Sequence, residues 1–219
     1  MVNGIKVIAS LTSHPPRING VGFTIFSLLK QSCKLDSIEL NLSKVNFPNG
    51  YGDLPDVLNN LYDKGCLCIN WVDGDTKTFK KLLPTVNKYY PEDYYVLTID
   101  DDCIYLPNYV KKMVYELGDS DSYCPADSKV IGNRMIYRST IFDSKFINTI
   151  IPDALIETYV DDMYIQCYLE HMNAKIKYGI NQSIRSDIRA FNDVCPARNH
   201  YTTGNRIALA YKLSKAIWG

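Results

Sequence analysis

The residues best suited to chemistry are three consecutive aspartates, Asp100, Asp101 and Asp102, which follow an apolar run over 94–99. Three like charges within a few ångströms repel one another unless a cation lies among them. Hard divalent cations such as Mg²⁺ and Mn²⁺ prefer oxygen ligands and often share them with substrate phosphates. The triplet therefore indicates a metal–phosphate site at the carboxyl end of a strand, where open α/β sheets bind ligands. A solvated acidic exit from the strand explains the same residues without a ligand.

A second acidic pair, Asp161 and Asp162, precedes an apolar-periodic segment that is typical of a helix. Either carboxylate suits the N-cap of that helix, although a cap requires only one of them. Among the histidines, His171 closes the same segment, where the helix dipole favours a cation. His200 lies in a polar loop, where solvation is a sufficient explanation. The Gly-Val-Gly segment at 20–22 has the spacing of neither the P-loop nor the dinucleotide fingerprint.

The first half of the chain predicts a scaffold for these side chains, because strand and helix patterns alternate in it. Strands are expected at 5–11, 37–42, 67–72 and 94–99, and helical segments at 23–30, 54–62, 79–89 and 108–117. Phe23, Phe26 and Leu29 recur at helical spacing in the first of these helices, and Pro84 suits a first turn or a kink in the third. This rhythm predicts an α/β fold with a mostly parallel sheet covered on both faces.

After Gly118 the elements become shorter. Strands are expected at 122–126, 130–137 and 174–179, and helices at 144–151, 160–172 and 205–218. The sequence contains no internal repeat and no low-complexity linker. A length of 219 residues suits one large α/β domain, so we expect a single domain over 1–219 with a change of character near residue 118.

Composition and charge exclude several classes of protein. Formal net charge is zero, with 24 acidic and 24 basic side chains, which provides no electrostatic footprint for nucleic acid or anionic membranes. No apolar stretch approaches the length of a membrane span. The seven cysteines are scattered, and no second close pair completes a zinc site with Cys66 and Cys68. We expect reduced, mostly buried thiols in a cytoplasmic protein.

Three segments together resemble a known family. They are Leu11-Thr12-Ser13-His14-Pro15-Pro16-Arg17, then Asp75-Thr76-Lys77 with Lys80-Lys81-Leu82, then Thr98-Ile99-Asp100-Asp101-Asp102. In this order they resemble the small glycosyltransferases of the GT-A fold, which occur in bacterial surface-polysaccharide clusters and in large DNA viruses of algae. The resemblance is strong over the first half of the chain and loose over the second. It implies the GT-A (nucleotide-diphospho-sugar transferase) fold.

The resemblance implies a nucleotide-sugar donor, usually a UDP-sugar, together with Mn²⁺ or Mg²⁺. Asp100 and Asp102 match the two acidic positions of the family's Asp-x-Asp motif. By resemblance Asp102 ligates the metal directly, Asp100 contacts the ribose or reaches the metal through water, and Asp101 faces the donor sugar. A divalent ion held there neutralises the charge that develops on the nucleoside diphosphate leaving group.

Other nucleotide contacts follow from the same resemblance. Thr12, Ser13 and Arg17 match the segment that wraps the nucleotide, with Arg17 suited to a diphosphate oxygen or a base carbonyl. A Pro-Pro turn with a solvated arginine explains this segment equally simply. Asp73 or Asp75 resembles the aspartate that pairs with uracil, and Lys77, Lys80 or Lys81 then reaches phosphate; Asp73 and Lys80 are the residues we select. A helix start with acidic residues followed by a solvated lysine face is the alternative.

The second half supplies the acceptor side under this resemblance. An acidic residue at the start of the corresponding helix serves as general base in inverting enzymes of this fold, which implies Asp162 as base and Asp161 as its neighbour or an acceptor-binding carboxylate. In a retaining enzyme the pair would orient the acceptor instead. A late histidine is a third metal ligand in several such enzymes, which implies His200. The resemblance thus divides the chain into a nucleotide-sugar-binding half over 1–118 and an acceptor-side half over 119–219.

The sequence therefore predicts a metal-dependent hexosyl- or deoxyhexosyl-transferase that acts on a glycan hydroxyl. Two alternatives stay open: a nucleotidyltransferase that acts on a sugar phosphate, and a non-catalytic nucleotide- or carbohydrate-binding module. We expect no membrane span and no nucleic-acid partner. We also expect a cytoplasmic location, which is the host cytoplasm if the source is viral. The chain is compatible with one domain of a longer polypeptide.

Overall fold

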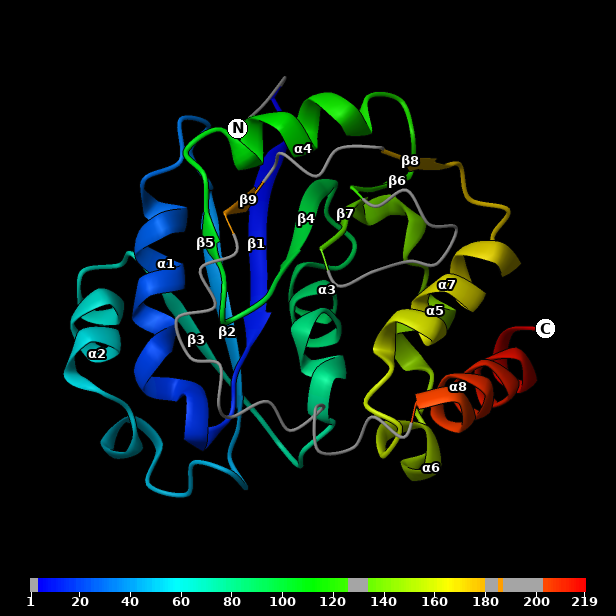
Figure 1. Cartoon of the computed structure of the whole chain (residues 1–219), viewed down its shortest axis with the longest axis horizontal. Helices are drawn as coiled ribbons and strands as arrows, with labels where there is room; N and C mark the ends of the chain where they lie inside the picture. The colour runs from blue at the N-terminus through cyan, green and yellow to red at the C-terminus, as the bar shows by residue number, and fades with distance from the viewer. Residues whose placement is uncertain (1–3, 126–133, 180–184, 187–202) are drawn as a thin grey trace.

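The computed structural model describes residues 4–125, 134–179, 185–186 and 203–219. Its centre is a seven-stranded sheet in the order β3-β2-β1-β4-β7-β6-β8. The parallel part consists of β1 (Lys6–Thr12), β2 (Ser37–Ser43), β3 (Cys68–Val72) and β4 (Tyr94–Ile99). Strand β1 lies between β2 and β4 in the middle of the sheet, as Figure 1 shows. Because β1 and β4 are parallel neighbours, the residues that follow them meet at the same end of the sheet, the carboxyl end of its parallel strands.

The helices that connect these strands lie close to their expected positions. They are α1 (Val21–Leu29), α2 (Asp56–Asp63), α3 (Leu83–Tyr89) and α4 (Tyr109–Leu117). Short 3-10 turns precede or join them: η1 (Pro15–Gly20), η2 (Gly50–Asp53) and η3 (Lys77–Lys81). Pro84 occupies the first turn of α3, where its missing N–H has no helical partner to lose.

The second half of the chain completes the sheet and covers one of its faces. Strand β7 (Ile136–Arg138) runs antiparallel to β4, while β6 (Ser122–Cys124) and β8 (Ile176–Tyr178) extend the edge. The helical elements are η4 (Ser139–Ile141), α5 (Ser144–Asn148), α6 (Asp153–Ile156), α7 (Asp161–His171) and α8 (Thr203–Trp218). A separate two-stranded ribbon pairs β5 (Ile104–Tyr105) with β9 (Arg185–Ser186).

Two apolar cores lie on opposite faces of the sheet. The first joins α1, α2 and α4 to the face of β1 that carries Val7 and Leu11. The second joins α3, α5, α7 and α8 to the face that carries Ile8. In Figure 1, α1 and α2 lie to the left of the strands and α5, α7 and α8 to the right. Both faces are covered, as the alternation of strands and helices predicts.

An aromatic cluster fastens the last helix to the second core. Trp218 is 2% exposed and packs against Phe146, Tyr164 and Tyr168, with ring centroids 4.8–6.1 Å apart. Aromatic pairs at such distances add to the free energy gained from burying their area. Helix α8 therefore belongs to the same packed unit as α7. Among the described residues, none of the helices is both long enough and apolar enough to span a bilayer.

Burial of individual side chains does not follow from helical spacing or from residue type alone. Phe23 and Phe26 are 57% and 43% exposed, because Val21, Ile25 and Leu28 form the buried face of α1. The described cysteines are reduced, yet only Cys103, Cys124 and Cys167 are buried while Cys66 is exposed. Cys195 lies outside the described residues. Local spacing shows which residues share a helix face, but packing decides which face is covered.

Candidate active site

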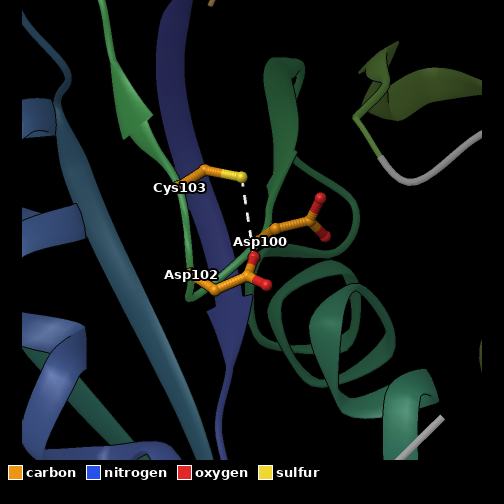
Figure 2. Close-up of side chains that lie close together, drawn as sticks. All are labelled: Asp100, Asp102 and Cys103. Carbon is orange, nitrogen blue, oxygen red and sulfur yellow. Dashed lines mark hydrogen bonds between the residues drawn. The ribbon is translucent and has the colours of Figure 1, made fainter. Parts of the chain in front are cut away.

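The three aspartates form the loop that leaves β4, beside the end of β1. Figure 2 shows two of them, Asp100 and Asp102, in this loop. The hydroxyl of Thr24 on α1 donates to the carbonyl oxygens of Asp101 and Cys103, at 3.0 and 2.9 Å. The hydroxyl oxygen of Tyr105 accepts from the backbone N–H of Asp100 at 2.9 Å. These contacts hold the loop from both sides, so the carboxylates are presented by a fixed backbone.

Arg17 and Ser13, which follow β1, bind the second half of the triplet. The Arg17 guanidinium lies 2.8 Å from an oxygen of Asp101 and 2.7 Å from an oxygen of Asp102. Ser13 donates to the other oxygen of Asp101 at 2.6 Å. Burial raises the pKa of Asp101 to about 6, although Arg17 and Ser13 act in the opposite direction. Asp101 is thus an inward-facing anchor for the loop after β1.

Asp100 pairs with two other cations, Lys81 and Arg134. Lys81 donates to one of its oxygens at 2.8 Å, and the Nε of Arg134 lies 3.4 Å from the other. Burial lowers the pKa of Arg134, and the charge of Asp100 outweighs that effect and raises it. Each carboxylate of the triplet therefore has a basic side chain beside it, which offsets the repulsion among them.

The second acidic pair comes to the same place from the start of α7. Burial favours the neutral form of Lys81, but the negative charges of Asp100, Asp161 and Asp162 raise its pKa above the ordinary value. Asp161 is 4% exposed, and burial raises its pKa. Burial and the neighbouring charge of Asp161 raise the pKa of Asp162 well above its usual range. Segments far apart along the chain thus share one electrostatic environment.

The donor atoms beside this loop fit a hard divalent cation. Ligand atoms of Asp100, Asp102 and Cys103 lie within 4.8 Å of one another, and Figure 2 shows the three side chains around the loop. The two carboxylates supply the oxygen ligands that Mg²⁺ or Mn²⁺ prefers. Burial, together with Asp100 and Asp102, raises the pKa of the Cys103 thiol to about 12. The carboxylates are therefore the ligands that suit such an ion.

A second charged cluster follows β3. Asp75 binds Lys77 at 2.8 Å and also pairs with Lys80, which is almost fully buried. Although burial acts in the opposite direction, hydrogen bonds from the two lysines hold the pKa of Asp75 well below its usual range. Burial, Arg17 and Lys80 together lower the pKa of His14 to about 4. His14 is therefore neutral at pH 7, and its electrostatic contacts connect this cluster to Arg17.

Two residues near these clusters have left-handed backbone conformations that bulky side chains rarely adopt. Lys77 has φ +52° and Tyr159 has φ +58°. The two meet across the chain, with the Lys77 ammonium 5.8 Å from the centre of the Tyr159 ring. Backbone strain of this kind persists only where surrounding structure imposes it, and it is frequent at binding sites. The contact brings the segment before α7 to the Asp75 cluster.

A cavity of about 230 Å³ lies elsewhere, at the amino ends of β2 and β3. Its lining includes Leu28, Leu35, Ser37, Leu67 and Cys68. None of the site carboxylates belongs to that lining, because they follow the opposite ends of the strands. The chemistry described above is therefore separate from this cavity.

Comparison with solved structures identifies the fold. The S. aureus TarS fragment 1–349 is similar with a TM-score of 0.57 and 13% identity over 81% of this chain and 59% of that one. Glucosyl-3-phosphoglycerate synthase from M. tuberculosis is similar with a TM-score of 0.61 and 11% identity over 99% and 81% of the two chains. The chain has the GT-A fold. It spans only 59% of the TarS fragment and 36% of a longer TarS chain.

Solved structures with a similar fold bind several different ligands. TarS has been crystallised with UDP, and the M. tuberculosis synthase with Mn²⁺, UDP and glucosyl-3-phosphoglycerate. 4-Diphosphocytidyl-2C-methyl-D-erythritol synthase from Anaerococcus prevotii is also similar, with a TM-score of 0.55 and 15% identity over 96% and 98% of the two chains. The sequence matches no protein-family model, and no curated protein is detectably similar to it.

Most of the site residues expected from the sequence gather at this end of the GT-A sheet. The members of that group are Ser13, Arg17, Lys80, Asp100, Asp101, Asp102, Asp161 and Asp162. Thr12 lies at the end of β1, and its hydroxyl donates to the carbonyl oxygen of Asn41 at 2.7 Å. Asp73 is 91% exposed and pairs with Lys44, whereas Asp75 lies among the lysines. His200 lies outside the described residues.

Three contributors are not indicated by the sequence alone. Lys81 was one of three alternatives for a phosphate contact, yet it lies among carboxylates. Arg134 and Tyr105 carry no sequence signal, because neither belongs to a motif and both reach Asp100 only through the fold. The adjacent Lys80 and Lys81 point to different acidic partners, which one-residue spacing in a 3-10 turn allows.

Proposed function

We propose that this chain is a metal-dependent glycosyltransferase that moves a hexosyl or deoxyhexosyl group from a UDP-sugar to a glycan hydroxyl. The observation that supports it most is the meeting of two acidic groups, the triplet after β4 and the pair at the start of α7, around the buried Lys81. A carboxylate loop suits the diphosphate side of such a reaction. A second, separate carboxylate suits the acceptor side.

In this proposal the protein holds the donor through residues that follow the first and fourth strands. Asp102 and Asp100 would hold Mn²⁺ or Mg²⁺, which would supply Lewis-acid stabilisation of the leaving diphosphate. Arg17, held by Asp101, presents its guanidinium edge to phosphate oxygens. Asp75 or Asp73 recognises the base, and Asp75 is favoured because it lies among Lys77 and Lys80. Residues 1–118 are then the donor half of the molecule.

Asp162 acts on the acceptor in the proposed reaction. Burial and the charge of Asp161 raise its pKa, so its carboxylate form is a stronger base toward the proton of the acceptor hydroxyl. As the acceptor oxygen forms its bond to the anomeric carbon, the bond from that carbon to the diphosphate oxygen breaks and UDP leaves. Asp161 keeps its neighbour's pKa high and orients the acceptor. In a retaining reaction the pair has the orienting role alone.

A screen of sugar nucleotides with and without Mn²⁺ tests this function. We expect one UDP-sugar to raise the melting temperature only with the metal, because a ligand of the native state stabilises it by mass action. The same pair should release UDP when an acceptor glycan is added. Asp102→Asn should abolish both effects, whereas Asp119→Asn, an exposed aspartate, is the matched control. Retained turnover in Asp102→Asn would contradict the proposal.

A nucleotidyltransferase is the second candidate, because the likeness to the A. prevotii synthase extends over nearly the whole of both chains. The same assay separates the two: release of pyrophosphate from a nucleoside triphosphate and a sugar phosphate would identify this activity, and release of UDP the first. A binding module would show metal-dependent stabilisation by ligand with no turnover in either assay.

A further inference from the structure

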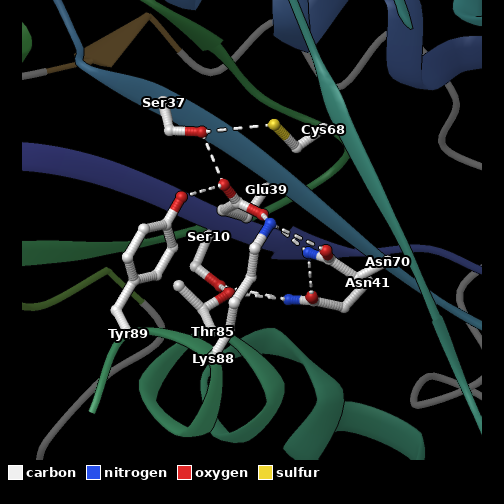
Figure 3. Close-up of polar contacts among 9 residues, drawn as sticks. All are labelled: Ser10, Ser37, Glu39, Asn41, Cys68, Asn70, Thr85, Lys88 and Tyr89. Carbon is white, nitrogen blue, oxygen red and sulfur yellow. Dashed lines mark hydrogen bonds and ion pairs between the residues drawn. The ribbon is translucent and has the colours of Figure 1, made fainter. Parts of the chain in front are cut away.

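A buried polar network lies between the sheet and α3. We call it the polar seam, and Figure 3 shows its members together. They come from three neighbouring strands and one helix: Ser10, Ser37, Glu39, Asn41, Cys68, Asn70, Thr85, Lys88 and Tyr89. Ser10, Glu39, Asn41 and Thr85 are completely buried. Polar groups in such a place cost free energy unless each finds a partner.

The outer half of the polar seam is centred on Glu39. One of its carboxylate oxygens accepts from Lys88 at 2.8 Å and from Asn70 at 2.7 Å, and the other accepts from Tyr89 at 2.7 Å and from Ser37. Burial raises the pKa of this carboxyl, but those four hydrogen bonds outweigh burial and lower it. Glu39 is therefore a carboxylate at neutral pH and fixes the end of α3 against β2.

The inner half of the polar seam ends on the backbone of Lys81. Asn70 donates to Asn41 at 2.9 Å, and Asn41 donates to the hydroxyls of Ser10 and Thr85 at 3.2 and 3.1 Å. Ser10 and Thr85 are 2.6 Å apart, and Ser10 donates to the carbonyl oxygen of Lys81 at 2.5 Å. The chain of hydrogen bonds thus runs from the pair of half-exposed Lys88 and buried Glu39 to the residue that binds Asp100.

Directional contacts fix the position of a helix more tightly than apolar contacts do. Two apolar surfaces of matching volume pack in several registers with little change in free energy, whereas a hydrogen-bonded network is satisfied in one register. The seam therefore determines where η3 and α3 lie relative to β1. Because Lys81 is the last residue of η3, its ammonium position depends on this register.

We propose that the polar seam is a positioning device for Lys81, with Ser10 and Thr85 as its positioning residues. The Lys81 ammonium lies 2.8 Å from Asp100 and interacts with the charges of Asp161 and Asp162. Lys81 is in this view the cation that holds the acidic loop of β4 and the acidic start of α7 in one arrangement. The structural part of this inference stands by itself, and its effect on turnover rests on the proposed function.

Paired variants at Thr85 separate hydrogen bonding from packing. Thr85→Val keeps the volume and loses the hydroxyl, while Thr85→Ser keeps the hydroxyl and loses a methyl group. The lysine side chains are isotopically labelled, and the NMR signal of Lys81 is the one that is lost in Lys81→Arg. We expect Thr85→Val and Ser10→Ala to displace that signal. Thr85→Ser should leave it in place, as should Ser122→Ala, a completely buried serine on β6 outside the seam. This readout needs neither donor nor metal.

The outcome at Thr85 decides the proposal. A Lys81 signal that moves in Thr85→Ser but not in Thr85→Val, or that stays in place in both Thr85→Val and Ser10→Ala, would overturn positioning by the seam. If the protein turns over a donor, we expect Thr85→Val and Ser10→Ala to lower kcat about tenfold and to leave the KM for the donor unchanged. Loss of one hydrogen bond that aligns Lys81 predicts a decrease of this size. Failure of every donor to turn over, with the NMR shifts present, refutes the proposed function and leaves the positioning role intact.

Discussion

Replacement of Lys81 by methionine should destabilise the fold strongly, because it removes a buried cation and leaves its acidic partners in place. The Lys81 side chain is 10% exposed and that of Asp100 17% exposed. Breaking a buried ion pair by removal of one partner costs about 3–5 kcal/mol in free energy of unfolding. Arg134 stays beside Asp100 and reduces the loss, so we expect about 3 kcal/mol at pH 8. Methionine retains most of the apolar stem, so the loss is electrostatic.

The loss should also depend on pH in a defined direction. The raised pKa of Lys81 means that its contribution is complete throughout the range below the unfolded value of about 10.4. Without Lys81, the pKa values of Asp161 and Asp162, already raised by burial, rise further. A folded-state pKa above the unfolded one makes stability increase as pH falls through it. The difference from wild type should therefore shrink between pH 8 and pH 5.

Urea unfolding followed by circular dichroism at both pH values measures this loss. Lys6→Met is the matched control, because Lys6 and Glu92 form a pair whose side chains are 47% and 50% exposed. Such surface pairs contribute about 0.2–1 kcal/mol. A Lys81→Met variant that loses no more than Lys6→Met, or loses the same amount at pH 5 as at pH 8, would refute the view of Lys81 as the buried cation of the site.

Three further perturbations have defined outcomes. Trp218→Ala should cost about 3–5 kcal/mol in thermal unfolding, because it removes the centre of the aromatic cluster that fastens α8. Glu39→Gln should lower the free energy of unfolding at pH 7 by about 1–3 kcal/mol. Because the pKa of Glu39 is lower in the folded than in the unfolded protein, wild type should be the more stable of the two above about pH 4.3. This difference in stability should disappear as the pH falls below that value. Asp162→Asn should reduce kcat by about 10²–10⁴-fold in the UDP-release assay if it is the base.

Each of these outcomes has a result that contradicts it. A Trp218→Ala protein with wild-type stability would mean that α8 is not part of the cooperative unit. A Glu39→Gln deficit that stays constant from pH 7 to pH 3 would show that the carboxylate charge does not stabilise the fold. Retention of full kcat in Asp162→Asn, with Asp119→Asn as control, would exclude a base at this position.

The sequence predicted the architecture well because periodicity is a local property. The four parallel strands and the helices between them lie within a few residues of their expected ranges, and Pro84 lies in the first turn of α3. The shorter elements β5, β9 and α6 were not predicted, since two to four residues carry no measurable period. The spacing of Phe23 and Phe26 did not show that they lie on the exposed side of α1, because α1 is apolar on more than one side.

The sequence by itself determined that acidic residues follow a buried strand. An apolar run that ends in aspartates places them at the carboxyl end of that strand, whichever strands pair with it. The sequence did not determine their partners. Arg17, Lys81 and Arg134 reach the triplet from three distant segments, and Asp161 and Asp162 arrive from α7. Only tertiary packing decides such contacts, because the charge that a carboxylate meets depends on distance in space, and burial then strengthens the effect by excluding water.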